Sequence, residues 1–504
     1  MVKGVGKVET WRMAEFSFSA EKDYDVGGGD AVRFDVVFSN RTDGTTIFRP
    51  GFWDGGRTFR VRFAPTSGGT WEWASSCADD LSLAGLRGQV ECVPYDGPLE
   101  IYRHGFVRSV TGKKYFVHAD GTPFFYLGDT HWSMLREEFD EAGSHADSID
   151  TNSHFKYIVD QRVVLGFSVY QSEPCAGKFD LSDGKVDASD IAGLRDADRY
   201  FRYIADKGLV HANAEFFFPT RLTEKLGRDL SALERLSRYW VARFGAWPVM
   251  WTIAQEIDDD TARPRPHIFY TSKDSPWYDV ARFVHAADAY RHPLSGHQEN
   301  TDRTVVSNSI FASPKARAET GHDWWAAQWH PGMKKNGNLA PAEQYWADDR
   351  PAVLYESNYC GLWTLDFGAR AQGYIAFLSG FCGYGYGATD IWLYKGTFEM
   401  GNYSTDGMVY VDPGHKRAPW GQAVNFPSAF QMRHLRRFFE SFDWWRMKPI
   451  FGKDRDDFIP HDPHCDAWRA AKIDGEFRKF IFCRLDIFSH LPLETGSGSL
   501  PLGP

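Results

Sequence analysis

Residues 247–258 read Trp-Pro-Val-Met-Trp-Thr-Ile-Ala-Gln-Glu-Ile-Asp, an apolar run that ends in polar side chains. Such a run predicts a strand buried on both faces, as in a parallel sheet, with Glu256 placed where the strand meets solvent. Residues 351–358, Pro-Ala-Val-Leu-Tyr-Glu-Ser-Asn, repeat the pattern and place Glu356 at the corresponding end. The sequence therefore predicts two parallel strands that each end in a carboxylate.

Two carboxylates at the same edge of a sheet suit one particular chemistry. An enzyme that cleaves a glycosidic bond with retention of configuration needs one carboxyl group as proton donor and another as nucleophile. A general acid needs a raised pKa, which Trp251 and Ile253 beside Glu256 would favour by excluding water. A nucleophile must stay ionised, so we expect hydrogen-bond donors near Glu356. The candidate donors are Tyr355, Asn358 and His297.

The composition narrows the possible partners. A chain of 504 residues is too long for one core and predicts two or three domains. The net charge of -10 argues against a nucleic-acid partner, because phosphate binding depends on Lys and Arg. Aromatic residues make up 16%, with 19 Trp, which fits either a large aromatic core or rings that stack on sugars. We expect a neutral carbohydrate ligand.

The cysteines and the first residues give further expectations. Seven Cys without a CxxC spacing predict reduced thiols rather than disulfides or a zinc site, so no metal is expected. No run approaches the roughly 18 to 20 apolar residues of a membrane span, so no membrane partner is expected. Residues 1–9 contain no apolar signal region, so we expect a cytoplasmic location. Secretion is the alternative, because removal of a signal peptide would leave the same sequence.

The first hundred residues read as short strands. Residues 16–19, 32–38 and 58–63 alternate apolar and polar side chains between glycine-rich turns, which predicts an antiparallel β-sandwich over residues 1–104. The loop at residues 49–56, Arg-Pro-Gly-Phe-Trp-Asp-Gly-Gly, carries two large aromatic side chains. It either packs against the next domain or helps to wall a sugar site.

From residue 105 short apolar strands alternate with amphipathic helices, such as the one over 198–208, and this is typical of β/α units. Eight strands predict a (β/α)8 TIM barrel over residues 105–445, an α/β fold. The predicted barrel strands are 124–127, 163–170, 209–217, 249–254, 294–296, 325–328, 353–355 and 382–386. Residues 446–504 predict a small or truncated C-terminal β segment with one strand over 476–483.

In a parallel barrel the carboxyl ends of all strands meet at one rim, so their side chains are candidates for substrate contact. These ends carry acids, amides, imidazoles and indoles, which a purely structural barrel has no need to place there. The candidate substrate-binding residues are Asp129, His131, Trp132, Gln171, Glu173, Glu215, Gln255, His297, Gln328, His330 and Trp392.

Some of these residues have alternative interpretations. Asp129 could instead hold loop amides, while Glu173 and Glu215 could serve as alternative acids. The glycine-rich residues 383–387 lack the GxGxxG spacing of a dinucleotide site and predict a close-packed last strand.

Several motifs resemble known families. Gly51-Phe-Trp-Asp-Gly-Gly56 and Gly69-Thr-Trp-Glu-Trp73, with Phe59-Arg-Val-Arg-Phe-Ala-Pro65, resemble the β-sandwich domain DUF5060. Most of the remaining chain, to about Lys448, resembles the DUF4038 or apiosidase-like glycoside hydrolases. The motifs that carry this second resemblance are Asp120-Gly-Thr-Pro-Phe-Phe-Tyr-Leu-Gly-Asp-Thr-His-Trp132, Gly166-Phe-Ser-Val-Tyr-Gln171, Gln328, Glu356, and Tyr384-Gly-Tyr-Gly-Ala388 with Trp392.

The resemblance implies a clan A type barrel and retaining chemistry, with Glu256 as acid/base and Glu356 as nucleophile. One position departs from the pattern. Many clan A enzymes have Asn-Glu after the fourth strand and apiosidase-like barrels often have Asp as the acid, whereas this chain has Gln255-Glu256. Gln255 can still reach a sugar 2-hydroxyl, but the change weakens the case for apiose as the substrate.

We therefore expect a retaining, exo-acting glycoside hydrolase that cleaves a terminal sugar from a plant or microbial glycoside or polysaccharide. No cofactor is expected, and assembly into a homo-oligomer stays open. One alternative is an inactive carbohydrate-binding scaffold. Another is a metal-dependent barrel hydrolase that uses His131, His297 and His330.

Overall fold

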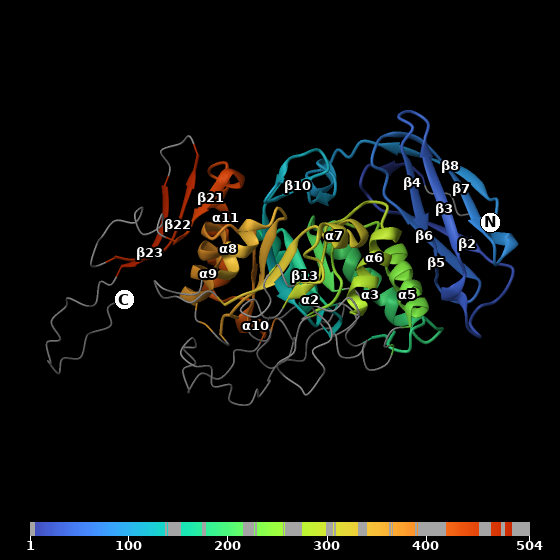
Figure 1. Ribbon diagram of the computed structural model, residues 1–504. Helices are drawn as coiled ribbons and strands as arrows, with labels where there is room; N and C mark the ends of the chain where they lie inside the picture. Colours follow the sequence, from blue (N-terminus) through green and yellow to red (C-terminus); the bar gives the residue numbers. More distant parts are fainter. Residues whose placement is uncertain are drawn as a thin grey trace.

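The protein consists of three parts in a row (Figure 1): an N-terminal sandwich, a central barrel and a small C-terminal sheet. The structure is a computed structural model. It describes residues 6–136, 139, 153–173, 178–214, 226, 229–255, 257, 275–298, 306, 309–330, 340–361, 364, 366–388, 391, 420–452, 465–474 and 479–485.

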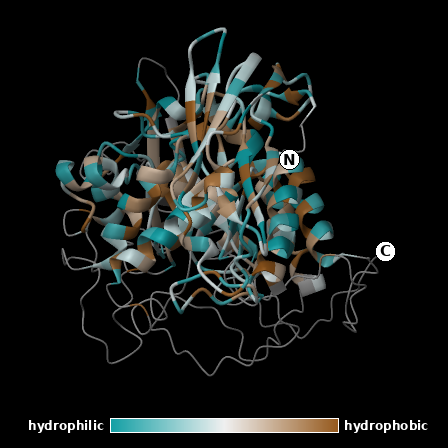
Figure 2. Cartoon of the chain, turned by 90° about the vertical axis from the view of Figure 1, so that its right-hand side faces the viewer, coloured by the Kyte–Doolittle hydropathy of each residue, from teal (hydrophilic) through white to brown (hydrophobic). Residues whose placement is uncertain are grey.

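The N-terminal part is the expected sandwich of two sheets. Phe38 of the larger sheet stacks on Phe63 of the smaller one, with ring centroids 4.0 Å apart, and lies 5.5 Å from Phe16. Apolar and polar residues alternate along these strands (Figure 2), so one face of each sheet is buried. The larger sheet has the order β1 (Val8–Glu9), β8 (Arg87–Val93), β7 (Gly69–Cys77), β3 (Phe34–Asn40) and β4 (Thr46–Pro50); the smaller has β2 (Ala14–Ser19), β6 (Thr58–Phe63) and β5 (Phe52–Trp53).

The central part is the expected parallel (β/α)8 barrel. Its strands are β12 (Tyr126–His131), β13 (Val169–Ser172), β14 (Val210–Ala214), β15 (Val249–Thr252), β16 (Leu294–Ser295), β17 (His297–Gln298), β18 (Trp325–Gln328), β19 (Ala352–Glu356) and β20 (Gly383–Tyr386). The fifth position is divided at Gly296: β16 pairs with β15, while β17 pairs with β18. A Cβ on Gly296 would lie 2.5 Å from Cδ1 of Ile257, so a larger residue would require Ile257 to move where the strand changes partner and closes the barrel.

The predicted bounds of two strands are wrong. Residues 163–170 were expected to form the second strand, but Val163 and Val164 end helix α2 (His154–Val164), and the strand begins only at Val169. β-Branched side chains favour strands locally, yet the helix is capped at Ser153, and Val164 is 72% exposed on its outer side. The predicted first strand, 124–127, is displaced because Phe124 belongs to a small sheet before the barrel. That sheet consists of β9 (Val107–Arg108), β10 (Phe116–His118) and β11 (Pro123–Phe124).

The close packing predicted for the glycine-rich last strand is confirmed. A Cβ on Gly383 would lie 2.6 Å from Tyr126, and one on Gly385 would lie 2.1 Å from the carbonyl oxygen of Tyr355. A Cβ on Gly387 would lie 2.0 Å from the ring of Tyr359. The glycines of β20 therefore leave room for its two neighbouring strands and for a tyrosine beside the rim.

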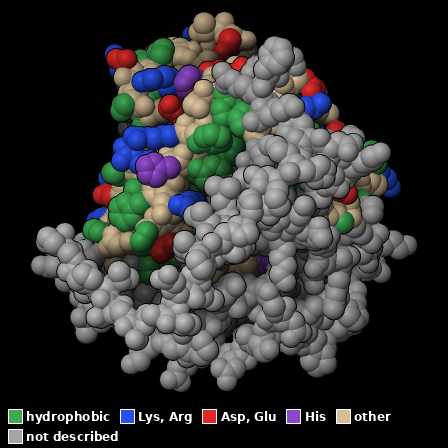
Figure 3. Space-filling model, turned by 90° about the vertical axis from the view of Figure 1, so that its left-hand side faces the viewer, with side chains coloured by type: hydrophobic (Ala, Val, Ile, Leu, Met, Phe, Trp, Pro, Cys, Tyr) green, Lys and Arg blue, Asp and Glu red, His purple; other side chains and the backbone are tan. Residues whose placement is uncertain are grey.

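Helices surround the barrel (Figure 1), and the described ones are α1 (Glu100–Arg103), α2, α3 (Ile191–Asp206), α5 (Leu230–Phe244), α6 (Pro276–Ala287), α7 (Pro314–Thr320), α8 (Ala340–Ala347), α9 (Asp366–Leu378), α10 (Trp420–Ala423) and α11 (Pro427–Phe439). The C-terminal sheet contains β21 (Met447–Ile450), β22 (Cys465–Ile473) and β23 (Lys479–Leu485). Phe480 stacks on Phe442 just beyond α11, at 4.5 Å, which holds this sheet on the barrel. On this side the described surface mixes hydrophobic side chains with Lys, Arg and His (Figure 3).

The aromatic loop at residues 49–56 packs against the barrel, as the first of its two interpretations predicted. Phe52 and Trp53 are buried, and Tyr239 of α5 donates a hydrogen bond to the carbonyl oxygen of Trp53 at 2.9 Å. The buried Arg49 donates to the carbonyl oxygens of Val241 and Ala242, at 3.1 and 3.4 Å. These carbonyls lie in the last turn of α5, where the helix dipole favours a cation. The oxygen of Val241 also accepts from the backbone of Gly245, so Arg49 is its second donor.

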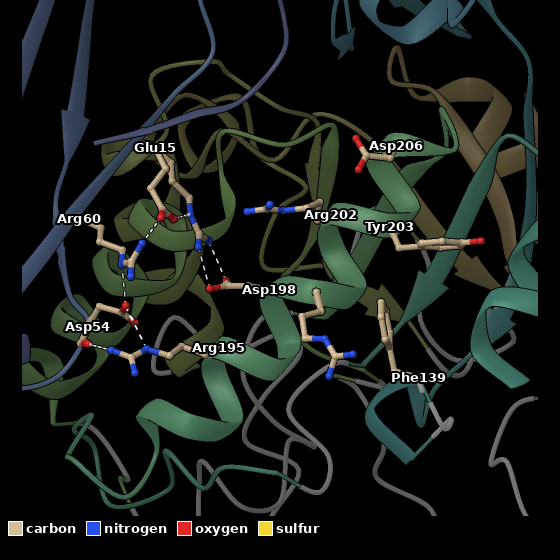
Figure 4. Close-up of a pocket in the computed structure, with 11 residues that line it drawn as sticks. Glu15, Asp54, Arg60, Phe139, Arg195, Asp198, Arg202, Tyr203 and Asp206 are labelled. Atoms are coloured by element: carbon tan, nitrogen blue, oxygen red, sulfur yellow. Dashed lines mark hydrogen bonds and ion pairs between the residues drawn. The ribbon is translucent and has the colours of Figure 1, made fainter. Parts of the chain in front are cut away.

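A chain of ion pairs continues this joint between sandwich and barrel. Arg62 of β6 donates to both carboxylate oxygens of Asp198 at 2.7 Å, and Arg243 of α5 binds the same carboxylate. Burial alone would raise the pKa of Asp198, but the two guanidinium groups hold it below its ordinary value. The network lines one wall of a cleft of about 400 Å³, where Arg60 and Arg195 both point to Asp54 (Figure 4).

Removing the carboxylate of Asp198 should strongly destabilise the protein, because two buried guanidinium groups would lose their shared partner. We expect Asp198→Asn to lower the free energy of unfolding by about 3 kcal/mol at pH 7, measured by urea denaturation. Because the pKa is lowered in the folded state, this contribution is present above about pH 4 and is lost as the pH falls further. The difference between the two proteins should shrink accordingly.

A matched control is Asp196→Asn on the same helix. Asp196 is partly exposed, and its carboxylate pairs with Lys178 and, at 2.9 Å, with Arg199. We expect it to cost less than about 1 kcal/mol. Equal losses for the two variants would show that the joint contributes no more than a surface ion pair.

Candidate active site

Glu356 is the last residue of β19, and its side chain faces the rim at which the strands end. It is 4% exposed. In the neighbouring strand β18 it pairs with Gln328, where the register of the two strands shifts by one residue after Ala327. The backbone N–H of Trp329 donates to the carbonyl oxygen of Glu356 at 3.2 Å. The irregular pairing thus turns the carboxylate toward the rim while the backbone stays bound to the neighbouring strand.

Two side chains contact the two oxygens of this carboxylate. The hydroxyl of Tyr359 donates a hydrogen bond to Oε1, and Nε2 of His297 lies 3.3 Å from Oε2. The indole N–H of Trp132, just beyond β12, donates to the Tyr359 oxygen at 2.7 Å. Residues from the first, fifth and seventh strand positions therefore meet at one carboxylate.

The protonation states of these neighbours favour an ionised Glu356. Burial lowers the pKa of His297 to about 3, so its ring is neutral near pH 7 and one nitrogen carries a proton. Burial and the Glu356 carboxylate raise the pKa of Tyr359 well above its ordinary range, so the phenol keeps its proton. The hydrogen bond from the neutral Tyr359 phenol stabilises the carboxylate without neutralising it, and the nearby His297 ring adds no opposing charge.

The sequence identified one of these two groups. His297 was among the predicted donors, whereas Tyr359 was missed. The available signal was its position three residues after Glu356, together with Gly387, whose missing side chain makes room for the tyrosine ring. Tyr355, another predicted donor, packs its ring against His297 and Trp132, with centroids 5.0 and 5.6 Å away.

Asp129 and His131 lie in a buried cluster on β12. Asp129 accepts hydrogen bonds from Nε of Arg162 and from the backbone of Thr130, and Nε2 of His131 is 3.0 Å away. Burial would raise the pKa of Asp129, but Arg162 and His131 lower it below its ordinary value. His131 stacks on Tyr170 at 4.3 Å. Protein groups thus hold this carboxylate, and a role in sugar binding stays a prediction.

Gln171 and Glu173 lie at the end of β13. Gln171 is buried inside the barrel and donates to the carbonyl oxygen of Tyr355 at 2.8 Å. Gly128 and Gly385 give it space, because a Cβ on either would approach its side-chain oxygen to 2.1 or 2.5 Å. Glu173 is buried, and burial together with the carboxylates of Glu356 and Glu173 raises the pKa of Tyr355. Both carboxylates therefore lie near the same tyrosine.

Two glutamines at the rim carry unused acceptors. Gln255 and Gln328 are 4% and 8% exposed, and their side-chain Oε1 atoms have no hydrogen-bond partner among the described residues. A buried polar atom without a partner is costly, so these two oxygens fit a site where water or a sugar hydroxyl binds. His330, after β18, is half-buried at the same rim.

Three predicted site residues, Glu256, Glu215 and Trp392, lie outside the described residues. The residues that flank Glu256 are described. Ile257 donates from its backbone to the carbonyl oxygen of His297 at 3.0 Å, and His297 donates to that of Ala254 at 3.2 Å. These two bonds attach the end of β15 to β17.

The described part of the chain contains no group of three His, Cys, Asp or Glu side chains arranged to hold a metal ion. His131, His297 and His330, the histidines of the metal-dependent alternative, are all within this part. None of the helices described is both long and apolar enough to cross a membrane.

Comparison with known families and structures agrees with the motifs. A family model described as the apiosidase-like catalytic domain matches residues 110–446, and a model of the domain of unknown function DUF5060 matches residues 7–78. A search of curated proteins gave no match.

Solved structures share the fold at low sequence identity. A protein from Bacteroides vulgatus ATCC 8482, provisionally described as a glycoside hydrolase, matches with a TM-score of 0.61 at 19% identity, over 87% of this chain and 79% of its own. A glycoside hydrolase family 5 protein from the same organism matches with a TM-score of 0.53 at 17% identity, over 74% of this chain and 79% of its own. At this level of sequence identity, the similarity shows a shared fold and nothing about the reaction.

The low pKa of His297 can be measured directly. We expect ¹⁵N NMR of histidine-labelled protein to show a neutral His297 ring from pH 8 down to about pH 4, because protonation would place a charge in a buried site. An exposed imidazole titrates near pH 6.5. His297→Gln would assign the signal, and a midpoint near pH 6 would contradict the neutral ring.

Proposed function

Because the chain belongs to the apiosidase-like family and is therefore a glycoside hydrolase, we propose that it is a retaining, exo-acting enzyme. Its substrate would be a plant or microbial glycoside or polysaccharide, from which it removes a terminal sugar. The observation that carries this proposal is the buried Glu356 carboxylate, held between the hydroxyl of Tyr359 and the neutral ring of His297.

In the proposed first step Glu356 acts as the nucleophile. One carboxylate oxygen attacks the anomeric carbon, the bond to the leaving oxygen breaks, and a covalent glycosyl-enzyme forms. The two neutral neighbours support this role, because they favour the charged carboxylate but leave it a lone pair for attack. A cationic partner would bind it more strongly and make it a poorer nucleophile.

Glu256 is the proposed acid/base. It would protonate the leaving oxygen in the first step and then accept a proton from the water that releases the sugar. The neighbouring Gln255 and, across the rim, Gln328 each offer a buried acceptor oxygen, which suits sugar hydroxyl groups. We propose that these two side chains orient the terminal sugar, with Glu173 and His330 as further contacts.

The exo preference rests on the bulky rings at the rim. Trp132 and Tyr359 are both buried next to the ends of their strands, which suits a pocket that takes one sugar rather than an open groove. On an oligosaccharide substrate we therefore expect monosaccharide as the first product.

Proton NMR of products formed from a panel of aryl and natural glycosides tests the nucleophile. We expect the first-formed anomer to retain the configuration of the substrate, and Glu356→Gln to be slower by at least about a thousandfold. Glu343→Gln, an exposed glutamate on α8, should keep full activity. An inverted first product or an active Glu356→Gln variant would refute the proposed role of Glu356, whereas an absence of turnover on every glycoside would favour the binding scaffold.

The acid/base role predicts a dependence on the leaving group. Glu256→Gln should lose about a hundred- to ten-thousandfold on alkyl glycosides, whose leaving oxygen needs a proton, and much less in the first step on dinitrophenyl glycosides. Burst kinetics would resolve that first step. A loss of the same size on both substrate types would assign the acid to another residue, with Glu173 the first to test.

A further inference from the structure

We infer that Trp132 is a positioning residue that keeps Glu356 a hydrogen-bond acceptor through Tyr359. The inference rests on the proposed function, in which Glu356 must be ionised to attack. It gives Trp132 a different role from the sugar contact expected from its place after the first barrel strand.

The direction of the hydrogen-bond chain follows from the kinds of atom in it. The indole N–H of Trp132 can only donate, so the Tyr359 oxygen must accept from it at 2.7 Å. A phenol has one hydrogen and two lone pairs, and the Tyr359 hydroxyl donates its hydrogen to Oε1 of Glu356. The indole N–H occupies one of the two lone pairs of the Tyr359 oxygen and makes the phenol a better donor, which favours the arrangement in which Oε1 accepts.

His297 lies close to the second oxygen. Its neutral ring places Nε2 3.3 Å from Oε2, but the two atoms are not aligned for a hydrogen bond. The bond that Oε1 accepts from the Tyr359 hydroxyl therefore carries the argument, because a hydrogen bond to the charged form lowers the pKa of a carboxyl group. The described titratable groups around Glu356 are His297 on β17, Tyr359 after β19 and, beyond Tyr355, Glu173 after β13.

Packing fixes the members of the chain in place. The ring of Trp132 is 3% exposed and lies against His297, with centroids 5.7 Å apart and planes at 27°. The ring of Tyr359 is buried over Gly387, where even a methyl group would collide with it. One face of the indole is thus covered by the same histidine that contacts Glu356, which suits a positioning role better than a sugar platform.

The test compares Trp132→Phe, which keeps a ring but loses the N–H, with Tyr359→Phe and the double variant. We expect Tyr359→Phe to lower kcat about ten- to hundredfold and Trp132→Phe about two- to tenfold, with KM nearly unchanged. Losing a donor to the carboxylate raises the pKa of Glu356, so the acidic limb of the kcat/KM profile should move to higher pH in both. Because Trp132 acts through Tyr359, the double variant should be no slower than Tyr359→Phe.

Direct titration separates this inference from the proposed reaction. In protein labelled with ¹³C at the glutamate carboxyl, the signal missing in Glu356→Gln identifies Glu356, and its pKa should rise in Trp132→Phe whether or not the protein turns over a glycoside. Trp324→Phe is the matched control, because the buried indole nitrogen of Trp324 has no hydrogen-bond partner among the described residues. It should leave the pKa of Glu356 unchanged.

Two results would overturn the positioning role. A higher KM in Trp132→Phe with an unchanged pH profile would make Trp132 a sugar platform, and effects that multiply in the double variant would show that Trp132 and Tyr359 act independently. If Glu356→Gln stays active while the pKa shift appears, the hydrogen-bond chain stands and the nucleophile is another group.

Discussion

Closure of the barrel at Gly296 is the constraint on which the site depends. The fifth strand binds β15 with its first half and β18 with its second, so the ring of strands closes within a single segment. His297 stands just after this change of partner, and β18 alone separates β17 from β19. The backbone of His297 also bonds to Ala254 and Ile257, just beyond β15. This residue therefore joins the two edges of the ring of strands and carries its imidazole to Glu356.

Much of the fold could be predicted because buried parallel strands are apolar on both faces. All eight strand positions were found, including the short fifth and sixth. The errors arose where local preference and long-range packing disagree: Val163 and Val164 have the side chains of a strand but end a helix, and Phe124 joins a small sheet before the barrel. No local pattern distinguishes these cases. The domain limits at residues 104 and 445 remain predictions.

The site was partly predictable for a similar reason. Glu356 ends β19 and His297 begins β17, positions that a periodic pattern reveals, whereas Tyr359 acts from a loop and needs space left by Gly387. The surroundings of Asp129 could not be predicted at all. Its carboxylate is bound by Arg162 of helix α2, and no spacing in the sequence indicates this contact. The roles of Glu256, Glu215 and Trp392 stay predictions from the sequence.

The contact of Arg49 with the last turn of α5 has a consequence for how such proteins can change over evolutionary time. The sandwich supplies the donors that two barrel carbonyls need, and Arg62 adds a third bond, to the carbonyl oxygen of Arg243 at 2.6 Å. Without the sandwich the carbonyl oxygens of Ala242 and Arg243 would lose these donors, whereas that of Val241 would keep its bond from the backbone of Gly245. An exchange of the sandwich would also have to replace these donors, so the two parts evolve under a shared constraint.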